Sequence, residues 1–429
     1  MTSMQTGMHY PIDIDALPAS WEKGYVGDFA LVIQPGFASG KHNKEGRGIP
    51  HIRPYNIDRL GKIDLSEIKF VAPDADTKRL HSGDVLFNNT NSSELIGKTS
   101  VIAAAGDWGF SNHMTRVTFS DAVSPKFGAY QLHYLWMRGY FLHNCVKHVN
   151  QASVSSTTLA RAIPFVKPPR PQQDDIVAEI EKQFSRLDEA VGNLKRVNAN
   201  LKRYKAAVLK AAVEGKLGSI ESSWKQAELG DIATSIRNGY SKKPDAERGT
   251  RIFRISAVRP MELDVNDVRY LSGTPSNYEP FLVEPGDVLF TRYNGSRDYV
   301  GVCARVPANI PPMVYPDKLI RVRVPGQMLL PEFLVILAST GRARNYIESK
   351  IRTTAGQSGI SGGDLKSLPL DIPQIGEQQH IVAEVERCLS LIRGLEAAVQ
   401  ANLTRADRLR QATLHDAFSG TLTSISGRQ

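Results

Sequence analysis

The sequence predicts an α+β protein with an internal pseudo-two-fold repeat, in which a mixed α/β globular domain followed by a long helix is present twice. Three observations support this fold class. Landmark motifs of the first half return in the same order in the second half, two long stretches have the apolar spacing of paired helices, and short apolar strands follow Gly-Asp turns in both halves. A length of 429 residues suits two to four domains.

Six landmarks form the repeat, and they keep their order with a nearly constant offset. The first three return 203 residues later: Ser20-Trp21 as Ser223-Trp224, Gly27-Asp28 as Gly230-Asp231, and GDVLF at Gly83–Phe87 as Gly286–Phe290. The others lie near the end of each half: a strand spaced by Pro164 and Pro168 or by Pro369 and Pro373, IVAEIE at Ile176–Glu181 or IVAEVE at Ile381–Glu386, and AAVEGKL at Ala211–Leu217 or DAFSGTL at Asp416–Leu422.

Between the landmarks the halves differ strongly. Residues 35–60 and 238–262 share little beyond an apolar-Arg step at Ile52-Arg53 and Phe253-Arg254. We therefore interpret the scaffold as repeated and the interior of each globular domain as different. The repeat predicts five segments: a loose N-terminal tail at 1–15, globular domains at 16–170 and 219–372, and helices at 171–218 and 373–424.

Two long segments have the seam of a helix that packs against another helix. The first, from 174 to about 213, has apolar residues at Ile180, Phe184, Leu187, Val191, Leu194, Leu201 and Val208. The second, from about 378 to 418, has Val385, Leu389, Ile392, Val399, Leu403, Ala406 and Leu409. Some 40 residues make a rod of about 60 Å. Two such stripes in one chain predict an intramolecular coiled coil that stops at Gly215 and Gly420.

Two features of the first helix leave alternatives open. Asn198 on the seam is either a polar residue that sets the register or a solvated position where the seam frays. The basic residues at 195–196 and 202–205 either face phosphate or a partner subunit, or form a solvated helix face.

Each globular domain combines buried strands, helices and polar loops. Val85–Phe87 and Val288–Phe290 predict strands, while 131–143 and 331–347 have helical spacing. Three polar stretches recur at similar places with different content: 41–44 and 237–243, 88–98 and 291–301, and 151–158 and 357–363. Singly, each resembles an ordinary surface loop. Together they favour surfaces that read base edges and phosphates, since Asn pairs with adenine and Arg with guanine.

The composition excludes several classes of protein. With 53 basic and 44 acidic residues, the net charge of +9 permits an anionic partner without requiring one. No stretch approaches 18 consecutive apolar residues, and the start of the chain lacks a signal-peptide pattern. Cys145, Cys303 and Cys388 lie too far apart for a zinc motif or a disulfide framework. We therefore expect a cytoplasmic protein with reduced thiols.

Motifs of catalysis are missing or incomplete. GKT at Gly97–Thr99 lacks the glycine of a phosphate-binding loop, because Ser92 stands five positions earlier. PDADTK at Pro73–Lys78 crowds its carboxylates into one turn, unlike a nuclease core. There is no Asn/Asp-Pro-Pro-aromatic motif for amino-group methylation, and His143, His148 and His380 lack further metal ligands nearby. We predict no catalytic, cofactor-binding or metal site.

The motifs resemble the specificity subunit of type I restriction-modification enzymes, over residues 17 to about 424. The resemblance rests on five segments: LPASW (Leu17–Trp21), IPHIRPYNI (Ile49–Ile57), GDVLF with the following Asn88–Thr99, GEQQHIVAEVE (Gly376–Glu386) and SGTL (Ser419–Leu422). The first helix departs from the pattern, because it opens with Gln172-Gln173-Asp174-Asp175 in place of Glu-Gln-Gln and ends in EGKL in place of SGKL.

The resemblance implies a DNA-binding subunit that is not itself an enzyme. Each globular domain would be a target recognition domain that reads one part of a bipartite asymmetric site in double-stranded DNA. The helices would pack antiparallel, set the spacer between the two domains and dock two methyltransferase subunits. Motor-nuclease subunits would complete a DNA adenine methyltransferase and ATP-dependent endonuclease. S-adenosylmethionine, ATP and Mg²⁺ would bind to those partners, and this chain would bind none of them.

We assign the candidate DNA-binding residues from the polar stretches and the shared apolar-Arg step. The candidates for base readout are Arg53, Tyr55, Asn56, Asn88, Asn89, Asn91, Arg254, Arg292, Asn294 and Arg297. The candidates for phosphate contacts are Lys41, Lys44, Lys98, Lys242 and Lys243.

Two alternatives remain beside this interpretation. The same fold could serve a system that methylates DNA without cleaving it. A coiled-coil scaffold with two protein-binding domains belongs to a different class, and it would show no DNA sequence preference in a mobility shift.

We expect Arg292→Ala to relax sequence discrimination only in the half of the site that the second domain reads, because a base contact carries sequence information. Binding titrations on sites altered in one half at a time measure this. Equal weakening on all sequences would instead identify a phosphate contact.

Overall fold

The computed structural model describes residues 10–72, 78–103, 106–217, 224–354 and 356–422. The chain forms two compact units, Met1–Leu194 with Ala401–Gln429, and Lys195–Gln400. The long helices α5 (Arg170–Val213) and α10 (Ile375–Phe418) are each shared between the units. The predicted division into domains and separate helices differs from this one, because the apolar core of each unit continues from the globular part into both helices. We call the globular parts head 1 (residues 10–169) and head 2 (residues 224–374).

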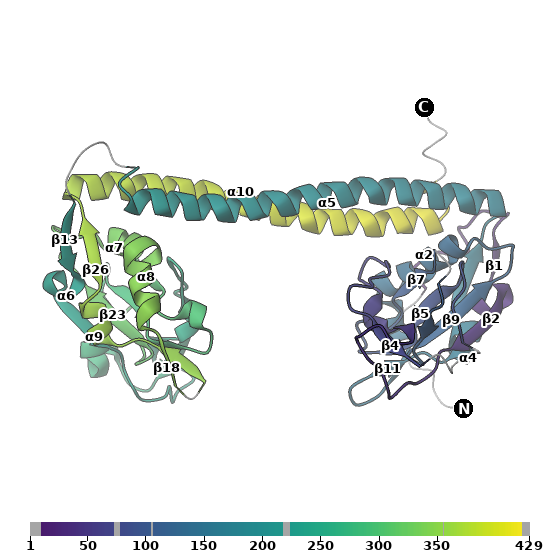
Figure 1. Ribbon diagram of the computed structural model, residues 1–429, viewed down its shortest axis with the longest axis horizontal. Helices are drawn as coiled ribbons and strands as arrows, with labels where there is room; N and C mark the ends of the chain where they lie inside the picture. Colours follow the sequence, from purple (N-terminus) through teal and green to yellow (C-terminus); the bar gives the residue numbers. More distant parts are fainter. Residues whose placement is uncertain (1–9, 73–77, 104–105, 218–223, 355, 423–429) are drawn as a thin grey trace. The chain divides into compact units, whose positions relative to one another are not determined.

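Head 1 contains a four-stranded antiparallel sheet in the order β2-β9-β5-β7 (Figure 1). It also contains a three-stranded sheet in the order β4-β3-β8. Strands β10, β11 and β6 form a third sheet, and β1 pairs with β12. The strands are β1 (Glu22–Tyr25), β2 (Ala30–Pro35), β3 (Ile49–Ile52), β4 (Lys69–Val71), β5 (Val85–Asn88), β6 (Thr90–Asn91), β7 (Thr99–Val101), β8 (Gly109–Phe110), β9 (Met114–Phe119), β10 (Val146–Lys147), β11 (Ala152–Ser153) and β12 (Pro164–Lys167). The helices are α1 (Val26–Phe29), η1 (Pro54–Asn56), α2 (Pro125–Met137), α3 (Tyr140–His143) and α4 (Ser156–Ala162).

Head 2 has the same sheet orders, β14-β23-β19-β21, β18-β15-β22 and β24-β25-β20, with β13 paired to β26 and an additional β16-β17 ladder. The strands are β13 (Lys225–Glu228), β14 (Ser235–Asn238), β15 (Thr250–Phe253), β16 (Val258–Arg259), β17 (Glu262–Leu263), β18 (Val268–Leu271), β19 (Val288–Thr291), β20 (Tyr293–Asn294), β21 (Cys303–Arg305), β22 (Met313–Val314), β23 (Leu319–Arg323), β24 (Arg352–Thr354), β25 (Gln357–Gly359) and β26 (Pro369–Ile372). The helices are α6 (Leu229–Ile232), η2 (Ile255–Ala257), η3 (Pro275–Phe281), η4 (Arg297–Tyr299), α7 (Pro331–Ser339), α8 (Gly341–Lys350) and α9 (Gly362–Lys366).

These matching orders confirm the predicted fold class and extend the repeat. The interiors of the globular domains, which differ in sequence and were expected to differ, share one strand topology. Strand β3 pairs parallel with β8 and antiparallel with β4, as β15 does with β22 and β18. Backbone pairing depends on strand position and on which face is buried, so the topology persists where side-chain identity does not.

The two predicted helical segments are each broken by a glycine. Gly139 separates α2 from α3 with a φ of 73°, and Gly341 begins α8 with a φ of 66°. This left-handed conformation strains most other residues, so both breaks fall at glycine. The long helices also end as predicted, just before Gly215 and Gly420, whose φ angles are 70° and 78°.

Within the first unit, α5 and α10 run antiparallel, because contacts move backward along α10 as they move forward along α5. Gln183 Oε1 accepts a hydrogen bond from Thr413 at 2.8 Å, and Asp188 pairs with Arg410 at 2.5 Å. The predicted seam contains one error. Leu409 is exposed, and Arg410 is buried against the Phe184 ring at 4.3 Å from its centroid. A charged residue on a seam escapes an apolar-spacing pattern, although its long stem and planar head pack well.

The predicted loose tail at 1–15 is wrong for the part that the structure describes. Ile12 is buried in the core of head 1, and the Tyr10 ring stands edge-on to Tyr140 with centroids 5.9 Å apart. A few apolar residues scattered among polar ones give no periodic signal from which their burial could be predicted.

None of the described helices combines the length and the apolar character that crossing a membrane requires.

A buried glutamine in the first turn of each long helix attaches that helix to its head. Gln173 accepts a hydrogen bond from the Ser124 backbone N–H and donates to the carbonyls of Ala122 and Pro168. Gln378 has the same three kinds of partner, the Leu330 N–H and the carbonyls of Met328 and Pro373. We call Gln173 and Gln378 the anchor glutamines.

Each repeated tryptophan contacts the first turn of one long helix and the glycine just beyond the end of the other. Trp21 donates its indole N–H to Gln172 at 3.2 Å and lies beside Gly420, just beyond α10. Trp224 donates to Glu377 at 3.2 Å and lies beside Gly215, just beyond α5. Each head therefore holds the start of one long helix and the end of the other.

We expect Gln378→Leu to lower the free energy of unfolding by about 3 kcal/mol, because three buried backbone groups lose their partner. Urea denaturation followed by circular dichroism measures this change. Gln379 is exposed in the same turn, so Gln379→Leu is the matched control. Equal effects of both substitutions would contradict the anchoring role.

Candidate nucleic-acid interface

An arginine follows the middle strand of the three-stranded sheet in both heads. Arg53 leaves β3 and begins η1, and Arg254 leaves β15 and begins η2, so the apolar-Arg step of the sequence occupies equivalent places. The Arg53 Nε and Nη2 atoms are buried without a hydrogen-bond partner in the structure. Arg254 is half exposed and pairs with Asp267 at 3.3 Å. Each arginine lines a cleft.

The head 1 cleft has a volume of about 720 Å³. It joins segments that are far apart in the sequence, so that Arg53, Tyr55, Asn91 and Gln151 share one concave surface. Its full lining is Arg53, Pro54, Tyr55, Ile57, Asp58, Arg59, Thr90, Asn91, Ser92, Leu95, Lys98, Ser111, His113, Asn150 and Gln151. The lining combines polar side chains that offer both donors and acceptors with a few apolar ones, which suits the edge of a base.

The head 2 cleft has a volume of about 510 Å³ and a more basic lining. It is formed by Tyr240, Ser241, Lys242, Lys243, Pro244, Ile252, Phe253, Arg254, Ile255, Ser256, Arg269, Pro316, Asp317 and Lys318. Five of these side chains are cationic and one is anionic, so the cleft favours an anionic or electron-rich ligand.

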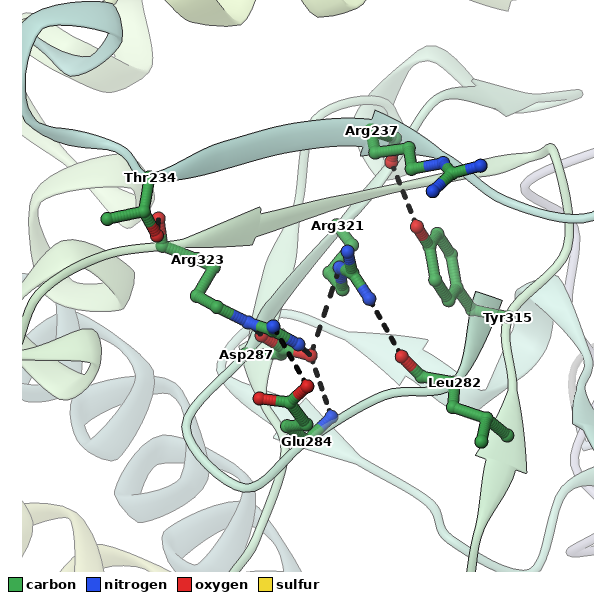
Figure 2. Close-up of polar contacts among 8 residues, drawn as sticks. All are labelled: Thr234, Arg237, Leu282, Glu284, Asp287, Tyr315, Arg321 and Arg323. Atoms are coloured by element: carbon green, nitrogen blue, oxygen red, sulfur yellow. Dashed lines mark hydrogen bonds and ion pairs between the residues drawn. The ribbon is translucent and has the colours of Figure 1, made fainter. Parts of the chain in front are cut away.

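Buried carboxylates of the Gly-Asp turns support both clefts. Asp287 accepts hydrogen bonds from Arg323 at 2.7 and 3.0 Å and from the Glu284 N–H at 2.7 Å, and Arg321 lies 3.9 Å away (Figure 2). Arg321 also donates to the Leu282 carbonyl at 2.7 Å and stacks over Tyr315 (Figure 2). These bonds hold β23 in place, and the residues just before it, 316–318, line the head 2 cleft.

Head 1 repeats this arrangement. Asp84 accepts from the His81 N–H at 2.7 Å and from the Thr118 hydroxyl at 2.6 Å, and Arg116 lies 3.8 Å away over Phe110. The turn before β9 supplies Ser111 and His113 to the head 1 cleft. The aspartate shared by the two GDVLF motifs therefore bonds to β9 or β23, the strand that follows the turn lining each cleft.

Four predicted contact residues are buried and have structural partners, which corrects their assignment. Their amide and ammonium groups bond to backbone or side-chain atoms inside head 1, although Lys98 also lines the head 1 cleft. They are Asn56, which donates to Asp64 and Glu67, Asn88, which donates to Leu95, Asn89, which donates to Asn112 and Thr115, and Lys98, which donates to Ile57. Burial also lowers the pKa of the Lys98 ammonium.

The remaining predictions divide between cleft and surface. Tyr55, Asn91, Lys242 and Lys243 line the clefts with the two arginines. Lys41 and Lys44 are exposed on the segment between β2 and β3, outside the cleft linings.

Three predicted residues of head 2 lie outside its cleft. Arg292 stacks on Tyr293 and donates to the carbonyl of Asp317, so it holds a residue that lines the cleft. Asn294 accepts from the Ser296 N–H, and exposed Arg297 donates to the Glu348 carbonyl.

The sequence analysis missed Arg59 in the head 1 cleft and Arg269 and Lys318 in the head 2 cleft. They stand outside the polar stretches. Arg59 follows Arg53 closely in the sequence, whereas the sheet topology brings Arg269 and Lys318 beside Arg254. No local signal distinguishes them from other basic residues. Among the described residues, no group of three His, Cys, Asp or Glu side chains could hold a metal ion. Residues 73–77 of the Pro73–Lys78 motif lie outside the described residues.

Comparisons with known proteins point to one family. The chain is 31% identical over 399 residues to the specificity subunit of the type I restriction enzyme EcoKI of Escherichia coli, covering 88% of this chain and 83% of that protein. It is 24% identical over 389 residues to the specificity subunit of StySPI of Salmonella potsdam, with the same coverage. No family model matches the sequence.

Solved structures share the fold. A chain from a type I restriction-modification system, studied for complex assembly and conformational transition, has a TM-score of 0.74 at 18% identity, covering 95% of this chain and 99% of that chain. The HsdS subunit of Thermoanaerobacter tengcongensis has a TM-score of 0.55 at 18% identity, covering 95% and 98%.

We expect Asp287→Ala to lower the free energy of unfolding by about 3 kcal/mol, because it leaves the buried guanidinium of Arg321 without its counter-charge. Urea denaturation measures the change. Exposed Asp298 in the same head provides the control, and Asp298→Ala should stay within about 0.5 kcal/mol of the parent. A loss as large as that of Asp287→Ala would refute the supporting role.

Proposed function

Because the chain belongs to the family of type I restriction enzyme specificity subunits, we propose that head 1 and head 2 each read one part of a bipartite asymmetric DNA site through their clefts. The observation that supports this most directly is the pair of equivalent arginines, Arg53 and Arg254, each opening on a cleft with a different lining. Because the two arginines occupy equivalent positions, each head approaches the DNA with the same geometry. A different lining makes the two heads select different sequences.

The head 1 cleft suits base-edge readout. Arg53 has guanidinium donors without protein partners, and Asn91 lies on the same surface. Arginine pairs with the O6 and N7 atoms of guanine, and asparagine with the N6 and N7 atoms of adenine, both in the major groove. Half-exposed Tyr55 at the rim offers an aromatic face and a hydroxyl.

The head 2 cleft combines readout with phosphate contacts. Arg254 is the base-reading candidate, because its pair with Asp267 is solvent-accessible and can exchange for a base. Lys242, Lys243 and Lys318 add positive charge around it. Such lysines raise affinity for any duplex and make it depend on salt, without adding sequence information.

The two long helices take the role of spacer and docking element in this proposal. Their length sets the distance between the half-sites, and their repeated surfaces dock two methyltransferase subunits. Motor-nuclease subunits then join the assembly. S-adenosylmethionine, ATP and Mg²⁺ belong to those partners, and this chain performs no catalysis of its own.

Selection of bound duplexes from a random pool by the full chain tests the reading role. Once the site is known, Arg53→Ala should relax discrimination about tenfold or more in one half, and Arg254→Ala in the other half, because each bidentate contact contributes about 1–3 kcal/mol. Competition titrations on sites with single base changes measure both effects.

Two controls sharpen this experiment. Exposed Arg138 lies outside the head 1 cleft, and Arg138→Ala should leave discrimination unchanged. Lys243→Ala should weaken all sequences alike and reduce the salt dependence by about one phosphate contact. Selection that recovers no preferred sequence would overturn the proposal and favour a protein-binding scaffold.

A further inference from the structure

One carboxylate in the first unit joins three segments that are far apart in the sequence. Asp188 on α5 accepts from Lys62 of head 1 at 2.5 Å through Oδ2. It accepts from Arg410 of α10 at 2.5 Å through Oδ1. Both carboxylate oxygens are therefore engaged, one by the head and one by the partner helix.

The helix side of this contact is firmly built. The Arg410 side chain is 5% exposed, and its guanidinium stacks on Phe184. Tyr130 of α2 meets the same Phe184 ring edge-on, with centroids 5.9 Å apart. Partial burial by itself would raise the pKa of the Asp188 carboxyl, but the hydrogen bonds from Lys62 and Arg410 outweigh it and lower the pKa. Asp188 is thus an anion whose position is set by the helix pair.

The head side of the contact is the segment 57–62, which we call the wall loop because residues 57–59 line the head 1 cleft. Asp58 Oδ1 accepts from the backbone N–H groups of Leu60 and Lys62, both at 2.8 Å. The carbonyl of Ile57 accepts from Lys98, and the His133 ring lies 3.3 Å from the Arg59 carbonyl. Internal bonds thus shape the wall loop, and Lys62 at its end connects it to α5.

No equivalent ion pair between head 2 and a long helix is found among the described residues of the second unit. Two cations, Arg393 and Lys205, line a pocket of about 380 Å³ there together with Glu262 of head 2. Among the described residues, no ion pair joins Glu262 to either cation. The contact at Asp188 is therefore a feature of head 1 and not of the shared scaffold.

We propose that the Asp188–Lys62 pair is a positioning pair that fixes the wall of the head 1 cleft to the helix pair. This inference rests on the proposed reading role of that cleft. The pair touches no base. It determines where Asp58 and Arg59 stand relative to the helices, so the bases that head 1 selects depend on a contact outside the cleft.

Hydrogen exchange of the DNA-free full chain tests the pair without reference to DNA. Lys62→Met should raise amide exchange in residues 57–62 about two- to fivefold, as expected for the loss of one accessible ion pair. Asp188→Asn should do the same, and Lys62→Arg should restore parental exchange. Lys126→Met is the matched control, because Lys126 of α2 also pairs with α5, at Glu181 and 2.6 Å, but does not line the cleft.

DNA selection provides the second readout. Lys62→Met should lower discrimination in the half-site of head 1 about two- to fivefold and leave the half-site of head 2 unchanged. Unchanged exchange in the wall loop, or an equal increase with Lys126→Met, would overturn the positioning pair. If the parent chain selects no sequence, the proposed function fails, while the exchange result still decides whether the pair holds the loop.

Discussion

A buried carboxylate directly before strand β5 in head 1 and strand β19 in head 2 is the constraint on which the rest depends. Asp84 and Asp287 are 2% and 1% exposed, so their charges require partners inside the protein. Arginines of the neighbouring strands β9 and β23 supply them, together with backbone N–H groups of the preceding turn. These bonds fix how β9 and β23 lie, and the turn that leads into each of these strands is part of a cleft.

The two heads divide their residues between support and selection. The aspartates brace each head internally, while the anchor glutamines of the long helices and the tryptophans of the heads attach each head to those helices through equivalent bonds. The cleft linings differ almost throughout, apart from the arginine after β3 or β15. A repeated support with unlike linings is the arrangement expected when similar partners must dock and different sequences must be read. The contact at Asp188 adds a second difference, since it ties only the first cleft to its helices.

The candidate site could be predicted only in part. Arg53, Arg254, Asn91 and Tyr55 follow recognisable motifs, and the structure places them in clefts. Asn88 and Asn89 follow the GDVLF motif but turn inward, because their amides bond to the backbone carbonyls of Leu95 and Asn112 in neighbouring loops. Polar residue type indicates hydrogen-bonding capacity, and it does not indicate whether the partner is a ligand or the protein itself.

The repeat, the long helices and their glycine ends could be inferred from residue order alone, because periodic burial and left-handed turns restrict the residues allowed at each position. Which loops meet at a cleft, and which charge lies buried on the helix seam, depended on the tertiary structure. Arg269 and Lys318 stand beside Arg254 through strand pairings that link distant segments. Arg410 replaces an apolar seam residue because Asp188 and Phe184, more than 200 positions away, compensate its charge. Such contacts join residues whose separation along the chain leaves no local pattern.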